Sequence, residues 1–209
     1  MEDNINSCLM MAAELYTPVD LRCFFQPEDL EGTGVELDTH ITLIYAQGKH
    51  IPRKQLLNDI EKILGGEEYV NLMEYIQTKE NYQNVLDLCE ISFFENDRDF
   101  LILKLKPDTQ LYNWCEKING GLRSKYDIKS DFDSYNPHLT LAELKPGKVE
   151  KYLGIHALEN VIRDSKVQFE DLFISYGTVQ ETRKQYWLTQ YKNVDRYFRL
   201  ERLKKEVFE

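Results

Sequence analysis

The spacing of apolar residues along the chain predicts alternating strands and helices. Runs rich in β-branched and aromatic residues, bounded by Gly and Pro, are typical of strands. They occur at residues 20–26, 38–47, 86–94, 99–106, 137–144, 166–176 and 184–192. Apolar stripes at spacings of three and four predict helices instead. These stripes lie at residues 52–64, 111–118, 148–162 and 194–207. The mixture predicts an α+β fold.

The length of the chain favours one folded unit. We expect 209 residues to form a single bilobal domain, 1–209, with its core at about 20–192. The pattern over 67–85 fits either a helical insertion over the cleft or a connector. Gly120–Gly121 is expected to end the helix before it, and Gly154 to weaken another. The amphipathic tail 194–207 is expected to cover its own domain, and the protein to be a monomer.

The charge of the chain limits its partners. A formal net charge of −10 disfavours long nucleic acids, because binding to a phosphate backbone depends on Lys and Arg. A small nucleotide or a short oligonucleotide held in a locally basic pocket escapes this objection. Cations on or near predicted strands could supply such a pocket, or could simply be solvated. These are Arg22, Lys49, Lys104 and Lys106.

The sequence also predicts a cytoplasmic protein that is not bound to a membrane. The N-terminus lacks the order of a signal peptide, and no apolar run has the length of a membrane span. The four cysteines are widely scattered and form no C-x-x-C pair. We therefore expect reduced and mostly buried thiols.

One short motif occurs twice. Thr39-His40-Ile41-Thr42-Leu43 and Pro137-His138-Leu139-Thr140-Leu141 share the pattern His-apolar-Thr-apolar on predicted strands. Because side chains alternate between the faces of a strand, each histidine shares a face with the threonine two residues later. The chain has four histidines, and His50 and His156 do not repeat the pattern, so both are expected to be structural.

Two His/Thr pairs are suited to cleaving a phosphodiester. One histidine can take a proton from the nucleophile while the other protonates the leaving oxygen. Each threonine hydroxyl can donate to a non-bridging phosphate oxygen. The alternative is that His40 and His138 are satisfied strand residues, with threonines present for β-propensity. The pattern offers one good metal ligand per strand and no H-E-x-x-H, so we predict catalysis without a metal or another cofactor.

The segments HITL and NPHLTLA resemble the two motifs of the two-histidine (2H) phosphoesterase superfamily, the LigT-like group. The resemblance implies two antiparallel sheets forming a central cleft, with helices outside. It also implies catalysis by His40, Thr42, His138 and Thr140. Members include 2′-5′ phosphodiesterases, RNA 2′,3′-cyclic phosphodiesterases and viral enzymes that destroy nucleotide signals.

The resemblance and the aromatic residues lead to a functional hypothesis. We expect hydrolysis of 2′-5′ linkages or of cyclic nucleotide and oligonucleotide signals, in a setting such as evasion of antiviral signalling. RNA-end 2′,3′-cyclic phosphodiesterase activity, nucleotide binding without turnover and RNA ligation are the alternatives. Tyr176, Phe25 and Tyr135 are candidates for stacking on a base, with core packing as the other interpretation of each. Tyr176 is preferred, because the family often uses that region near the phosphate.

Overall fold

The structure is a computed structural model of the chain. It describes residues 5–78, 82–95, 97–129 and 134–177, together with the backbone of 184–187. The predicted tail helix at 194–207 and the end of the predicted strand 184–192 lie outside these residues.

The strands form a single antiparallel sheet. Its members are β1 (Asn6–Tyr16), β2 (Leu30–Val35), β3 (His40–Ala46), β4 (Gln83–Asn84), β5 (Cys89–Glu95), β6 (Asp99–Leu105), β7 (His138–Leu144), β8 (Lys166–Gly177) and β9 (Lys184–Trp187). The strand order is β4-β8-β1-β3-β7-β6-β5, and β2 pairs with β7 while β9 pairs with β8.

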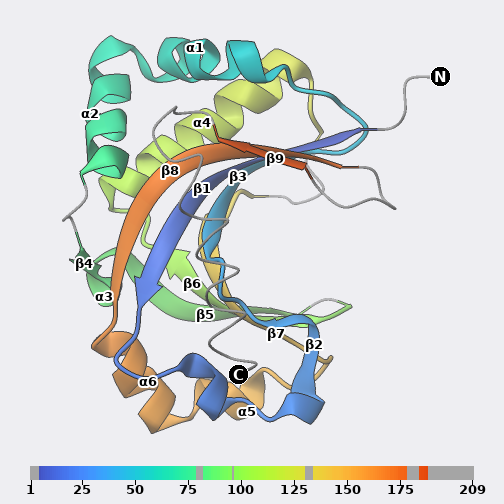
Figure 1. Cartoon of the computed structure of the whole chain (residues 1–209), viewed down its shortest axis with the longest axis vertical. Coiled ribbons are helices and arrows are strands. Elements are labelled where there is room, and N and C mark those ends of the chain that lie inside the picture. The colour runs from blue at the N-terminus through green and yellow to red at the C-terminus, as the bar shows by residue number, and fades with distance from the viewer. Residues whose placement is uncertain (1–4, 79–81, 96, 130–133, 178–183, 188–209) are drawn as a thin grey trace.

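The helices lie between the strands in sequence. They are α1 (Arg53–Leu64), α2 (Gly66–Gln77), α3 (Val85–Leu88), α4 (Gln110–Tyr126), α5 (Glu150–Leu153) and α6 (His156–Arg163). Two short 3-10 helices, η1 (Leu21–Phe24) and η2 (Pro27–Asp29), precede β2. In Figure 1, α1, α2 and α4 lie at one end of the curled sheet, and α5 and α6 lie at the other.

The two expected halves of the sheet are joined at a narrow seam. β3 belongs to the half that contains β1 and β8, and β7 to the half that contains β6 and β5. The ladder between β3 and β7 consists of one antiparallel pair, Ile41 with Leu139. The sheet curls where the halves meet (Figure 1). The predicted α+β class and the antiparallel pairing of the strands are therefore confirmed. The two expected sheets are two halves of one continuous sheet.

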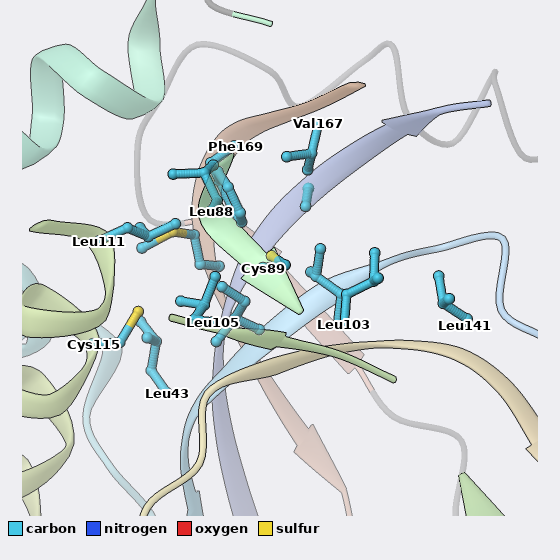
Figure 2. Close-up of a cluster of buried hydrophobic side chains, with 14 of the residues drawn as sticks. Leu43, Leu88, Cys89, Leu103, Leu105, Leu111, Cys115, Leu141, Val167 and Phe169 are labelled. Carbon is cyan, nitrogen blue, oxygen red and sulfur yellow. The ribbon is translucent and has the colours of Figure 1, made fainter. Parts of the chain in front are cut away.

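The main hydrophobic core lies between the helices and one face of the sheet. Leu43 of β3 and Leu105 of β6 lie beside Leu111 and Cys115 of α4 there, and Leu103 and Leu141 lie further along the sheet (Figure 2). The opposite face carries a smaller buried cluster of Cys8, Met10 and Ala12 from β1 and Phe173 from β8. β1 is thus covered on both faces, which explains why it is apolar almost throughout.

The sequence interpretation is wrong at the N-terminal part of the chain. Residues 20–26 contain the 3-10 helix η1 instead of a strand, and Asp20 caps η1 by accepting a hydrogen bond from the Arg22 backbone. The strand lies earlier, at β1, in the middle of the sheet between β3 and β8. β1 was missed because a strand buried on both faces has no polar alternation to reveal it.

Two further differences concern helices. The stripe that was expected to stop at Gly120–Gly121 continues to Tyr126. Gly121 lies where α4 passes close to α1, a position that leaves no room for a larger residue. A Cβ on Gly121 would lie 2.6 Å from Cγ2 of Ile63. Within the ambiguous region 67–85 the structure places helix α2, and the short strand β4 pairs with β8. The expected break at Gly154, between α5 and α6, is confirmed.

Candidate active site

The two motifs occupy equivalent positions on neighbouring strands. His40 begins β3 and His138 begins β7. The alternating residues Ile41 and Leu139 are completely buried in the main core. The two histidines and two threonines are half-buried and lie on the other face of the sheet, which we call the motif face.

The seam brings the two motifs together. With Ile41 opposite Leu139 in an antiparallel pair, the next positions in register place His40 beside Thr140 and Thr42 beside His138. Each histidine is thus next to the threonine of the other motif. The single ladder pair therefore brings two segments far apart in sequence to the same place on the sheet.

A backbone hydrogen bond holds each imidazole in the same way. The Nδ1 atom of His40 lies 2.9 Å from the carbonyl oxygen of Asp38, and that of His138 lies 2.7 Å from the carbonyl oxygen of Asn136. Since a carbonyl oxygen only accepts, each Nδ1 carries the hydrogen and donates it. Each Nε2 therefore remains available to take or give a proton.

Each motif ends in a register shift. The β1–β3 ladder skips Leu43, and the β6–β7 ladder skips Leu141. Both residues and the residue that follows each of them are buried, so the alternation of exposed and buried side chains stops directly after each threonine. Bulges re-aim side chains and are frequent beside active sites. The internal repeat therefore includes a matching irregularity of the backbone.

Each histidine also contacts a phenylalanine. The rings of His40 and Phe173 are 6.2 Å apart between centroids, and those of His138 and Phe94 are 4.8 Å apart, both edge to face. Each phenylalanine comes from the second strand beyond the motif strand, β8 in one half and β5 in the other. The two halves are thus related by an approximate twofold repeat around the seam.

The surroundings of His138 favour its neutral form. Burial lowers the pKa of His138 from the ordinary histidine value, the hydrogen bond to the Asn136 carbonyl partly opposes this, and the charge of His40 lowers it further. The electrostatic effect of one histidine on the other agrees with their closeness at the seam. A neutral imidazole with a free Nε2 is suited to act as a base.

The aromatic candidates from the sequence lie on the main-core side. Tyr176 pairs with Ser7 in the β1–β8 ladder, and alternation directs it away from the face that carries Phe173. Its hydroxyl donates to the Ile51 carbonyl at 2.5 Å, and its ring stacks on His50. The sequence did not single out Phe173, because alternation shows which residues of a strand share a face but not which face carries the motifs.

The other two candidates are also enclosed. Phe25 is 6% exposed and packs against Tyr152 of α5, with ring centroids 4.8 Å apart. Tyr135 donates its hydroxyl to the carbonyl oxygen of Thr42 at 2.9 Å, and burial raises the pKa of this tyrosine well above its ordinary value. Tyr135 therefore links the segment before β7 to the backbone of β3 at the first motif.

One of the four candidate cations lies at the site. Arg22 pairs with a carboxylate in its own turn, Lys49 contacts carbonyls at the end of α4, and Lys106 contacts a carbonyl of α3. Lys104 is the ladder partner of His138 on the motif face. Sequence pattern alone could not select Lys104, because the selection depends on which strands pair.

The remaining candidate chemistry lies elsewhere. His156 on α6 is exposed, with 94% of its side chain accessible, and sits 3.4 Å from Glu159. The four cysteines, all within the described ranges, form no disulfide, and three of them are buried, as the sequence predicted. Across the described ranges, no cluster of three or more His, Cys, Asp or Glu side chains is arranged for a metal ion. No helix in these ranges is both long and apolar enough to span a bilayer.

Comparison with known proteins gives distant structural neighbours. No family model matches the sequence, and no curated protein matches it. Escherichia coli LigT complexed with 3′-AMP is 12% identical, with a TM-score of 0.42, over 86% of this chain and 96% of LigT. Kluyveromyces marxianus Usb1 with uridine monophosphate is 10% identical, with a TM-score of 0.38, over 85% of this chain and 97% of Usb1.

A second structure of K. marxianus Usb1 is 11% identical, also with a TM-score of 0.38, over 88% of this chain and 97% of Usb1. Because the TM-scores lie below 0.5, the functional proposal rests on the histidine geometry instead.

Proposed function

We propose that the protein is a metal-independent phosphodiesterase that hydrolyses small nucleotide phosphodiesters. The proposed substrates are 2′-5′ linkages and cyclic nucleotides or oligonucleotides, such as those used as antiviral signals. One observation carries the proposal. Two histidines on adjacent strands both direct Nδ1 to a backbone carbonyl, which leaves both Nε2 atoms for proton transfer beside the two threonines.

The chemistry follows from this arrangement. One neutral Nε2 takes a proton from water while the water oxygen bonds to phosphorus. The other histidine, protonated at Nε2, donates its proton to the leaving oxygen as the old P–O bond breaks. The hydroxyls of Thr42 and Thr140 donate to the non-bridging oxygens, where negative charge increases in the transition state. Phe94 borders His138 and is half-buried, so it offers apolar surface to a nucleoside.

The first test compares turnover of a substrate panel by the wild type and two variants. The panel contains 2′-5′ oligoadenylates, 2′,3′-cyclic nucleotides, RNA ending in a 2′,3′-cyclic phosphate and cyclic dinucleotides. His40→Ala and His138→Ala should each lower kcat by roughly 10²- to 10⁴-fold, the usual effect of a general acid or base. His156→Ala is the matched control, because this exposed histidine should leave kcat unchanged.

The panel also separates the alternatives. Turnover only of RNA ends would identify an RNA-end 2′,3′-cyclic phosphodiesterase. A rise in Tm with a nucleotide but no product from any compound would indicate a binding module and contradict the enzyme hypothesis. Full activity in both histidine variants would exclude the two-histidine mechanism.

A further inference from the structure

The twofold repeat around the seam is broken by one charged residue. The outer neighbours of the motif residues in the β1–β3 ladder are Ala12, opposite His40, and Met10, opposite Thr42. In the β6–β7 ladder they are Ile102, opposite Thr140, and Lys104, opposite His138. Lys104 and Ala12 therefore hold equivalent places in the two halves. Of these four neighbours, three are apolar and one is a cation.

Lys104 is placed to reach a ligand beside His138. Its side chain is 31% exposed, so its ammonium group remains accessible from solvent. Its acidic neighbour is Glu90, directly across the β5–β6 ladder, and the two charged groups are 3.9 Å apart. This separation is at the limit of an ion pair, so a phosphate oxygen can compete for the ammonium group.

We propose that Lys104 binds the substrate phosphate beside His138 and thereby fixes which way round an unsymmetrical phosphodiester lies. The inference rests on the proposed function and extends it to the orientation of the substrate. An ammonium group next to a phosphate provides a charge-assisted hydrogen bond. No equivalent bond exists at Ala12, so the two possible orientations of the diester differ in energy.

This asymmetry assigns a role to each histidine. A cation beside His138 opposes protonation of its imidazole, so His138 acts as the general base and activates the water. His40 then acts as the general acid and protonates the leaving oxygen. On the side of His40 the ladder continues through Ala12 to Asp171, whereas on the side of His138 it reaches Lys104 and then Glu90. Burial and the charge of His40 already lower the pKa of His138, which favours the same neutral form.

The described strands around His138 contribute further charged or titratable groups. β3 contributes His40, β6 contributes Lys104, and β5 contributes Glu90 behind it. On β7 itself, Glu143 is paired with Arg98. Glu90 partly offsets the field of Lys104. Removing Glu90 should therefore have the opposite effect on His138 to removing Lys104.

The test measures kcat/KM against pH for Lys104→Met, Lys104→Arg and the wild type, with the panel compound that the wild type hydrolyses. Methionine keeps the apolar stem, and circular dichroism with Tm verifies folding. Lys104→Met should lower kcat/KM roughly 10- to 100-fold, the effect of losing a hydrogen bond to a charged group, and Lys104→Arg should restore most of it. Lys117→Met is the control, because Lys117 pairs with Glu68 on the helices and should have no effect.

The pH profile tests the assignment of roles. If His138 is the base, the acidic limb of the profile should move to higher pH in Lys104→Met and to lower pH in Glu90→Gln. NMR titration of His138 without substrate should show the same directions. An unchanged kcat/KM and an unmoved acidic limb in Lys104→Met would overturn the inference, as would a shift of the alkaline limb alone. The proposed function fails separately, if His40→Ala and His138→Ala remain active.

Discussion

Ile41 of β3 and Leu139 of β7 face each other across the seam, and their pairing is the one rung of the ladder that joins the two halves of the sheet. Both side chains are completely buried on the helix-covered side. Because neighbouring residues alternate in direction, burying this pair turns His40, Thr42, His138 and Thr140 to the opposite face. The same contact therefore stabilises the junction and assembles the candidate site.

The threonine hydroxyls should contribute to catalysis but little to stability. Thr42→Val and Thr140→Val each keep the shape of the side chain and remove one donor, so kcat should fall by roughly 10²- to 10³-fold with little change in Tm. Thr39→Val is the control, because the Thr39 hydroxyl donates to the Ala13 carbonyl on the core side at 2.8 Å. It should lower Tm and leave kcat unchanged. Equal kcat in all three variants would contradict the proposed role.

The contact between α1 and α4 should distinguish two adjacent glycines. Gly121→Ala would place a methyl group 2.6 Å from Ile63, whereas nothing lies within 4 Å of a Cβ on Gly120. Gly120→Ala should therefore raise the free energy of unfolding by about 1 kcal/mol through helix propensity. Gly121→Ala should lower it by about 1–3 kcal/mol through overpacking.

Urea denaturation measures both glycine variants. Adding Ile63→Ala to Gly121→Ala should recover part of the loss, because it removes the atoms in conflict. If the two single variants are equally stable, the close approach of the helices is wrong.

Stability should depend on pH through His138. Burial lowers its pKa in the folded protein, so the unfolded chain takes up a proton at this residue at higher pH. The resulting stabilisation is complete above the ordinary histidine pKa of about 6.5 and is lost as pH falls through the lowered folded-state value. Between about pH 7.5 and 5, the free energy of unfolding should therefore fall more steeply for the wild type than for His138→Gln.

Urea titrations at several pH values test this difference. His156→Gln provides the reference, because it makes the same substitution at a histidine whose side chain is 94% exposed. Parallel curves for the wild type and His138→Gln would show that His138 titrates alike in the folded and unfolded states.

Activity should survive removal of metal ions. The proposed mechanism uses two imidazoles for proton transfer and two hydroxyls for charge stabilisation, so no step needs a Lewis acid. After exhaustive treatment with EDTA and phenanthroline, kcat should remain at its initial value. Loss of activity that zinc or magnesium restores would contradict the prediction.

The sequence by itself determined the repeated His/Thr motif and most of the local structure. Two copies of His-apolar-Thr-apolar fix which residues share a face, because alternation is a property of any strand. Amphipathic stripes likewise located α1, α4 and the broken helix at Gly154. These features are local, and local spacing is sufficient to reveal them.

The tertiary structure decided what surrounds the motifs. Strand pairing placed Lys104 beside His138, brought Phe94 and Phe173 to the histidines, and turned Tyr176 to the other face. It also buried β1 on both faces and required glycine at position 121. Each of these depends on contacts between segments distant in sequence, whose register is set by packing across the whole sheet and not by the spacing of residues within any one strand.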